Sequence, residues 1–119
     1  MKKKTTSSHL ARLIIKSGGR VFFLDTDEID WIEAADYCVL LHVGKKSYLL
    51  RETMTELETK LDPQKFLRIH RSTVINVERL RELQAQGSGD YSVLLRDGTK
   101  LRLSRRRRET LQAVLKQLA

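Results

Sequence analysis

Hydrogen-bond donors gather in one short stretch of the chain, residues 66–76, which reads FLRIHRSTVIN. Two arginines, a histidine and a serine interrupt its apolar residues: Arg68, His70, Arg71 and Ser72. The β-branched residues that follow favour an extended backbone. We therefore predict a short buried element that presents cationic donors on one exposed side, which is an arrangement suited to an anion. The alternative is that these side chains are only a solvated face of the fold.

A second basic cluster begins at Ser104, where the chain reads SRRRR. Ser104 can cap the last helix, and the four arginines that follow would then occupy its first turn. That placement opposes the helix dipole, which favours anions at this end by about 0.3–1 kcal/mol per charge. A bound phosphate chain would neutralise the arginines and satisfy the free N–H groups of the turn. The alternative is that salt screening makes four exposed arginines tolerable without a ligand.

The position of each arginine in this run predicts its role. Arg105 lies next to the cap, so it is the one best placed to read a base edge. A bidentate arginine on O6 and N7 of guanine is the commonest specific contact with DNA. Arg106, Arg107 and Arg108 would instead meet phosphates, which give affinity without sequence information.

The charge of the whole chain agrees with a polyanionic partner. The chain has 119 residues, a length typical of one domain, and a net charge of +8. Such a surplus favours nucleic acid before an anionic membrane. Residues 25–36 include six acidic residues and no basic residue, whereas residues 96–108 include seven basic residues and one acidic residue. The positive pole is therefore expected near the end of the chain.

Cysteine use and hydropathy predict a cytoplasmic protein. Cys38 is the only cysteine, so an internal disulfide is excluded, which fits a reducing compartment. No apolar run approaches the roughly 18 residues that span a bilayer. Residues 1–9 are expected to form a disordered basic tail, and residues 10–119 a single folded domain.

Hydrophobic periodicity predicts a mainly β chain with two helices. Glycine-containing turns at residues 17–19 and 97–98 predict hairpins. A capping box at Thr53 and Glu56 begins one helix, and Leu111, Val114, Leu115 and Leu118 share one face of a closing helix. The segment that contains Leu80 and Leu83 is either helix or strand. Strands are expected over residues 10–16, 21–24, 28–34, 37–43, 47–50, 66–75, 91–95 and 100–103.

Other classes of function receive less support. His70 lacks a carboxylate partner and neither Ser72 nor Ser104 is framed by glycines, so we predict no hydrolase and no enzyme. The histidines are not at metal-ligand spacing, and we predict neither a metal nor a cofactor. RNA binding remains an alternative, although only 6% of residues are aromatic and none alternates with the bases near the end of the chain. A module that pairs its acidic and basic poles between copies is a further alternative.

Four stretches together resemble the LytTR DNA-binding domain, the output module of many bacterial response regulators: DEIDWIEAADYCVLL, YLLRETMTELETKL, FLRIHRSTVINVERL and YSVLLRDGTKLRLSRRRRETL. Their order and spacing also match, and the resemblance covers residues 21–115. It implies an elongated arrangement of small antiparallel β-sheets with short helices. It also implies sequence-specific duplex-DNA binding in transcription regulation, by loops that enter successive major grooves.

The resemblance implies which residues contact DNA. Base contacts are expected from Tyr37, Arg71 and Arg105. Asp36, His70, Ser72 and Ser104 flank these positions. Independently of the resemblance, the basic side chains around them are expected to contact or face phosphates: Lys65, Arg68, His70, Arg106, Arg107 and Arg108. At Asp36 this chain departs from the family, which often has Asn there. A carboxylate is repelled by phosphate, although it could accept from N4 of cytosine.

The resemblance also implies partners. Two copies should occupy repeated half-sites about one helical turn apart. Family members usually carry a receiver or sensor domain ahead of this module, and the segment ahead of Val21 is too short for one. We therefore expect either a stand-alone regulator or an excised output domain, with a receiver or sensor acting in trans or removed.

Overall fold

The computed structural model describes residues 9–87 and 89–118, without the side chain of Leu118. The expected basic tail therefore lies outside the described residues, except for His9. The strands are β1 (Arg12–Ser17), β2 (Arg20–Asp25), β3 (Trp31–Ala35), β4 (Cys38–Val43), β5 (Lys46–Leu50), β6 (Phe66–His70), β7 (Thr73–Asn76), β8 (Leu80–Ala85), β9 (Tyr91–Leu95) and β10 (Lys100–Leu103). The helices are α1 (Met54–Glu58) and α2 (Arg108–Leu118), with 3-10 turns η2 (Thr26–Glu28), η3 (Val77–Arg79) and η4 (Arg105–Arg107).

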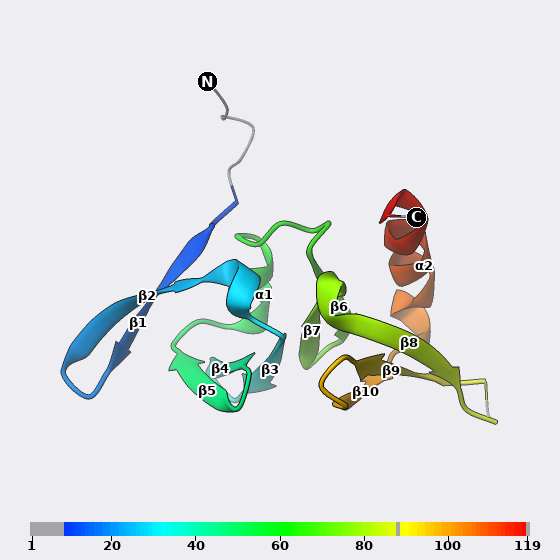
Figure 1. Cartoon of the computed structure of the whole chain (residues 1–119), viewed down its shortest axis with the longest axis horizontal. Helices are drawn as coiled ribbons and strands as arrows, with labels where there is room; N and C mark the ends of the chain where they lie inside the picture. The colour runs from blue at the N-terminus through cyan, green and yellow to red at the C-terminus, as the bar shows by residue number, and fades with distance from the viewer. Residues whose placement is uncertain (1–8, 88, 119) are drawn as a thin grey trace, which may run out of the picture.

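Three small antiparallel sheets follow one another along the longest axis of the molecule (Figure 1). The β1–β2 hairpin stands at one end, and β10–β9–β8 lies with α2 at the other. Between them lies a five-stranded sheet in the order β5–β4–β3–β7–β6. The molecule measures 47 × 37 × 23 Å. The predicted fold class, an elongated set of small β-sheets with short helices, is confirmed.

The central sheet separates two hydrophobic cores. Successive residues of a strand point to opposite faces, and on β7 Val74 joins one core while Ile75 joins the other. The first core lies under the β1–β2 hairpin and α1, where Leu57 is fully buried. The second lies under β8–β10 and α2, where Leu111 is fully buried. The two ends of the molecule therefore pack against opposite faces of the central sheet.

The capping box predicted for α1 is present. The Thr53 hydroxyl accepts from the Glu56 amide at 3.1 Å, and the Glu56 carboxylate accepts from the Thr53 amide at 3.0 Å. These bonds satisfy backbone donors that the first turn of a helix leaves unpaired. The bonds that the Glu56 carboxylate accepts from the Thr53 amide and hydroxyl also lower the pKa of Glu56.

Two segments differ from their predicted form, and a third, which the sequence left open, is resolved. Residues 66–75 are a hairpin of β6 and β7, and not one element, because the chain reverses at Arg71 and Ser72. The ambiguous segment around Leu80 and Leu83 is a strand, because it pairs with β9. The arginines 105–107 form the 3-10 turn η4, and α2 begins only at Arg108.

Candidate nucleic-acid interface

The turn between β6 and β7 presents the first predicted base-reading arginine. The Ser72 amide donates to Nδ1 of His70 at 3.2 Å, and the Ser72 hydroxyl lies 2.9 Å from the same nitrogen. These bonds close the turn without a glycine. Arg71 lies at its tip, where it is exposed. A register shift between Arg68 and His70 interrupts the strand alternation just before the turn, and such irregularities re-aim side chains.

The turn between β3 and β4 lies beside the first. The Ala34 amide, at the end of β3, donates to the Ser72 carbonyl at 2.9 Å. Asp36 has a φ of 42°, a left-handed conformation that Asp and Asn tolerate better than other non-glycine residues. Tyr37 follows it and is 90% exposed. An aromatic ring this exposed contributes little to the core and is available to a partner.

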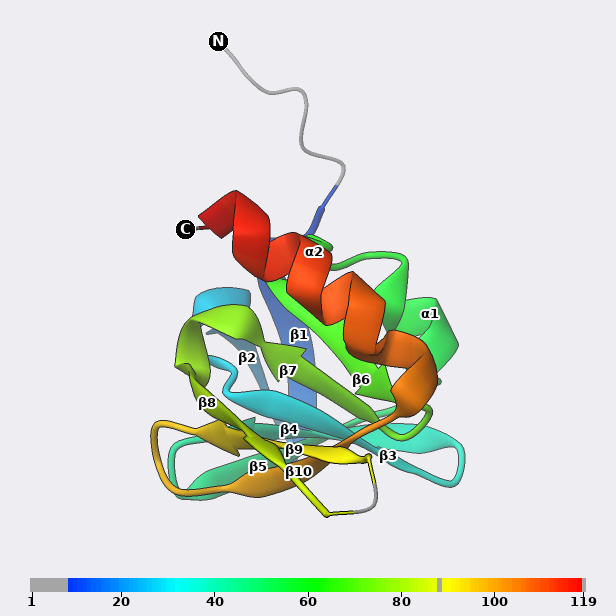
Figure 2. The same ribbon diagram turned by 90° about the vertical axis from the view of Figure 1, so that its right-hand side faces the viewer.

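The junction of β10 and η4 carries the second predicted base-reading arginine. The Ser104 amide donates to the Ile69 carbonyl at 2.7 Å, and Figure 2 shows the start of α2 beside the end of β6. The predicted cap is present, since the Ser104 hydroxyl accepts from the Arg106 amide at 3.3 Å. Nε of Arg105 donates to Oδ1 of Asp90 at 2.8 Å, and the Arg105 side chain stays 69% exposed.

His70 lies between the β6–β7 turn and β10, among charges from both. Its pKa is lowered, first by partial burial and then by the charges of Arg102, Arg71 and Arg68. These arginines come from β10, from the β6–β7 turn and from β6 itself. His70 also lines an open hollow together with Arg102, Ser104, Arg105 and Asp90, whose carboxylate pairs with Arg105. The arrangement can accept an anion between β6 and β10.

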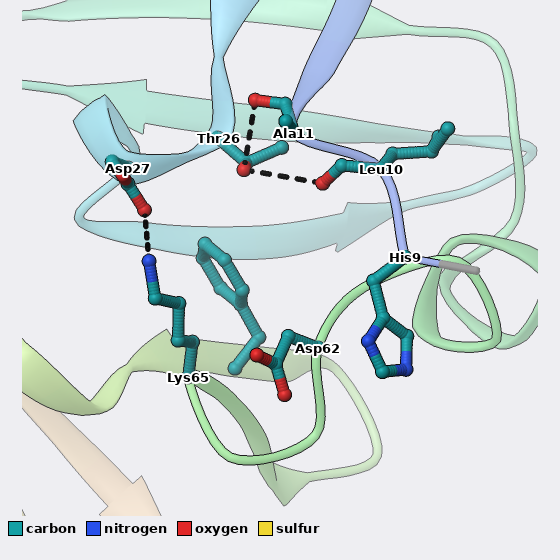
Figure 3. Close-up of a pocket in the computed structure, with 8 residues that line it drawn as sticks. His9, Leu10, Ala11, Thr26, Asp27, Asp62 and Lys65 are labelled. Carbon is teal, nitrogen blue, oxygen red and sulfur yellow. Dashed lines mark hydrogen bonds and ion pairs between the residues drawn. The ribbon is translucent and has the colours of Figure 1, made fainter. Parts of the chain in front are cut away.

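Two predicted phosphate ligands have protein partners. Lys65 lies before β6, at the opposite end of that strand from the turn, a separation of about 17 Å for five residues. Its ammonium group is 2.6 Å from Oδ1 of Asp27 (Figure 3), and this bond raises the pKa of Lys65. Arg68 pairs with Glu58 of α1 at 3.1 Å and also donates to the Arg71 carbonyl. Its side chain is only 14% exposed.

The arginines after Arg105 differ in exposure. Arg106 is exposed, whereas Arg107 and Arg108 are half-buried. The guanidinium of Arg108 lies 5.1 Å from the ring centre of Tyr91, in a cation–π contact. Among the four arginines at residues 105–108, Arg105 and Arg106 are therefore the most accessible to a partner.

Two residues of this surface were not among the predicted site residues. Arg102 could have been found from the alternation of β10, in which Leu101 and Leu103 flank it and leave it on the basic face. Asp90 had no comparable signal, because it lies 15 residues before its arginine and follows a flexible-looking glycine-rich segment.

None of the helices within residues 9–87 and 89–118 has the length and apolar character needed to cross a bilayer.

Comparisons with known proteins show the family and the fold. The model of the LytTr DNA-binding domain family matches residues 19–116. The chain is 30% identical to the sensory transduction protein LytT of Bacillus subtilis, over 87% of this chain and 43% of that protein. It is 28% identical to the transcriptional regulatory protein LytR of Staphylococcus aureus, over 78% of this chain and 38% of that protein. The chain therefore spans less than half the length of these relatives.

A solved LytTr DNA-binding domain from Bacillus cereus has the same fold. It superposes with a TM-score of 0.79 at 16% identity, and covers 89% of this chain and 97% of that domain. Since the family model extends over most of the residues and the fold agrees, the chain belongs to the LytTr DNA-binding domain family.

Proposed function

We propose that this domain binds duplex DNA sequence-specifically, as part of a transcription regulator, by inserting three loops into successive major grooves. The observation that carries the proposal is the pair of backbone bonds that gather the loops: Ala34 to Ser72 and Ser104 to Ile69. They bring three segments that are far apart in sequence to one side of the scaffold.

The residues at this surface divide into two roles. Arg71, Arg105 and Tyr37 are proposed to contact bases, because each is exposed at the tip or junction of its loop. The residues around them are proposed to meet phosphates or to flank the bases: Asp36, His70, Ser72, Ser104, Arg106, Arg107 and Arg108. We reassign Lys65 and Arg68 to the scaffold. Lys65 pairs with Asp27 at the end of β6 remote from the turn, and Arg68 pairs with Glu58 and is only 14% exposed.

We further propose that two copies bind repeated half-sites about one helical turn apart. A receiver or sensor domain, in the same polypeptide or in trans, would supply the signal, as the names of the longer relatives suggest. The stoichiometry is measurable by native mass spectrometry on DNA that carries one or two half-sites. One copy bound to the two-site duplex would contradict the arrangement.

A selection of bound sequences from a random duplex pool tests the proposed function. A repeated consensus should emerge, and the selected duplex should compete better than a scrambled duplex and better than single-stranded RNA of equal length. Preference for the RNA would favour the alternative of a basic β-rich RNA-binding module. Equal competition by selected and scrambled duplexes would exclude sequence-specific recognition.

A protein contact at the β1–β2 hairpin is a second candidate function. Ile14 and Phe23 are directly opposite each other, and are 55% and 61% exposed on the outer face of the hairpin. Arg12 and Asp25 lie on the same face and supply both signs of charge, so a second copy of the chain is the partner we propose. Light scattering should then show dimers that Phe23→Ser abolishes, whereas a monomer at high concentration would contradict this role.

A further inference from the structure

We propose that Asp90 is a positioning residue that orients Arg105 for base reading, which adds Asp90, the residue before β9, to the interface. The inference rests on the proposed function and extends it to a residue that neither the charge pattern nor the family resemblance selects. It concerns how one arginine is held and not which base it meets.

The contact between the two side chains is well formed. Oδ1 of Asp90 accepts from Nε of Arg105 at 2.8 Å. A bond to Nε constrains the plane of the guanidinium more than an ion pair with a lysine would, because the group is rigid and planar. Asp90 is 32% exposed at its side chain and Arg105 69%, so the acid lies deeper than the arginine that it holds.

The loop that carries Asp90 is itself tied down. The Gln86 amide donates to the Asp90 carbonyl at 2.8 Å, and the Gly89 amide donates to the Gln86 carbonyl at 3.1 Å. The side chain of Gln86 also donates to the Ser92 hydroxyl at 3.1 Å. Gly89 lies beside the guanidinium, since a Cβ built on it would be 4.0 Å from Nη2 of Arg105. The described residues around Asp90 are therefore held by hydrogen bonds of their own, and the Asp90 carboxylate binds Arg105 from this fixed position.

The charge of Asp90 explains why its role is one of orientation. A carboxylate among arginines repels phosphates and so lowers non-specific affinity for DNA. Exposed ion pairs also add little to the stability of a fold. What the contact does provide is pre-organisation, because an arginine already held in one geometry loses less side-chain freedom on binding. Pre-organisation matters most for a bidentate contact with a base edge, because two hydrogen bonds must form in a fixed geometry.

A competing account treats Asp90 as a counter-ion that masks Arg105 until DNA displaces it. The two accounts predict opposite effects on discrimination. If Asp90 positions Arg105, its removal should reduce the ratio of specific to non-specific affinity. If it only masks the arginine, removal should raise both affinities and leave their ratio unchanged.

Asp90→Ala and Asp90→Asn test the proposal, with Asp97→Asn as the matched control. Asp97 lies at the β9–β10 turn, at the opposite end of the same small sheet, and Asn can keep its bond to the Thr99 amide. Binding of each variant to the selected duplex and to a scrambled duplex is measured by fluorescence anisotropy at fixed salt. Urea unfolding of each variant verifies that the fold is intact.

Asp90→Ala should lower the ratio of the two affinities by about three- to tenfold, a part of what losing a whole bidentate contact costs. Asn retains an acceptor oxygen, so the affinity ratio of Asp90→Asn should lie between those of Asp90→Ala and the wild type. Asp97→Asn should leave the ratio unchanged. In the Arg105→Ala background, Asp90→Ala should cause no further loss, because the two residues act as one unit.

An unchanged ratio in Asp90→Ala, or a further loss in the Arg105→Ala background, would overturn the positioning role while leaving the proposed function intact. A wild-type domain that binds selected and scrambled duplexes equally would overturn both.

Discussion

The amide of Ser104 donates to the carbonyl of Ile69 over 2.7 Å, which joins the start of the arginine run to β6 by a bond between main-chain atoms. The Ala34 amide makes an equivalent bond to Ser72 at 2.9 Å. The relative positions of the three loops are therefore determined mainly by backbone bonds. Replacing an exposed side chain on one loop should remove its contact without moving its neighbours, so single substitutions at this surface can be interpreted individually.

Arg105→Ala should weaken binding to the selected duplex by about 1–3 kcal/mol and relax the preference at one base position. The reason is that this arginine lies at the junction where β10 meets η4, is 69% exposed and is held in one orientation by Asp90. Competitive binding against duplexes that vary one position at a time measures the effect. Equal losses on selected and random DNA would show that Arg105 contacts only phosphate.

Arg107→Ala is the matched comparison, because it removes the same side chain two residues later in η4. It should weaken binding to selected and random duplexes about equally. The slope of log K against log salt should fall by about 0.9 for one lost phosphate contact. A slope that does not change would argue against a phosphate role for Arg107.

Arg68→Ala should reduce both stability and base discrimination. The Arg68 guanidinium connects Glu58 of α1 with the Arg71 carbonyl, and bonds to charged groups contribute about 1.5–3 kcal/mol each. Its loss should lower the free energy of unfolding, measured in urea, by an amount of that order. It should also loosen the turn that presents Arg71, and thereby reduce discrimination at the base that Arg71 meets.

Asn76→Ala provides the control for stability alone. Asn76 is 3% exposed, and its amide donates to the Ile29 carbonyl at 2.9 Å, at the end of β7 remote from the turn. Its truncation should cost about 1–3 kcal/mol of unfolding free energy, because buried groups are left unpaired. If Asn76→Ala impairs discrimination as much as Arg68→Ala does, the effect of Arg68 is one of general stability.

The sequence was informative where local chemistry determines structure. The capping box at Thr53, the turn at Asp97 and Gly98 and the cap at Ser104 all depend on residues close together in the chain, and all are present. The segment around Leu80 was ambiguous because its form depends on pairing with β9, which local periodicity does not encode. The reversal at Arg71 and Ser72 lacked a glycine or asparagine signal, because a histidine ring nitrogen closes that turn.

The surroundings of the candidate site residues were predictable in part for the same reason. Grouping Lys65 and Arg68 with Arg71 relied on nearness in sequence, whereas strand length carries Lys65 to the far end of β6. The carboxylates that engage these residues, Asp27 and Glu58, come from elsewhere in the chain. Asp90 is a further example, since only the folded chain brings it to Arg105.

His70 should make stability and DNA affinity respond oppositely to pH. Partial burial and the neighbouring arginines lower its pKa below the ordinary 6.5 in the DNA-free fold. The unfolded chain therefore binds a proton at pH values where the fold does not. The contribution of His70 to the free energy of unfolding is therefore fully present above about pH 6.5. It is lost as the pH falls from there through the lowered pKa. Urea unfolding at a series of pH values measures it.

Phosphates near His70 would favour its charged form, so DNA binding should take up a proton and affinity should increase as the pH falls below neutral. His70→Gln should flatten both pH profiles relative to the wild type, because Gln does not titrate. Profiles of the wild type and of His70→Gln that run parallel would show that other groups are responsible.

Asp36→Asn should raise affinity for DNA while leaving stability unchanged. Asn adopts the left-handed conformation of residue 36, with its φ of 42°, as readily as Asp does, so the β3–β4 turn should keep its form. The substitution removes a negative charge next to Tyr37, where phosphates are proposed to pass. Affinity for selected and random duplexes should rise by a few-fold at low salt, and the gain should shrink as salt screens the charge.

Asp36→Ala separates the charge from the conformation of this turn. It removes the same charge but places a residue without a side-chain amide or carboxylate in the left-handed region, at a cost of about 1–2 kcal/mol. It should therefore gain affinity less than Asp36→Asn and unfold at lower urea. A loss of discrimination in Asp36→Asn with stability unchanged would instead indicate that the carboxylate accepts from a cytosine amino group, and that the first loop reads a base through Asp36 as well as Tyr37.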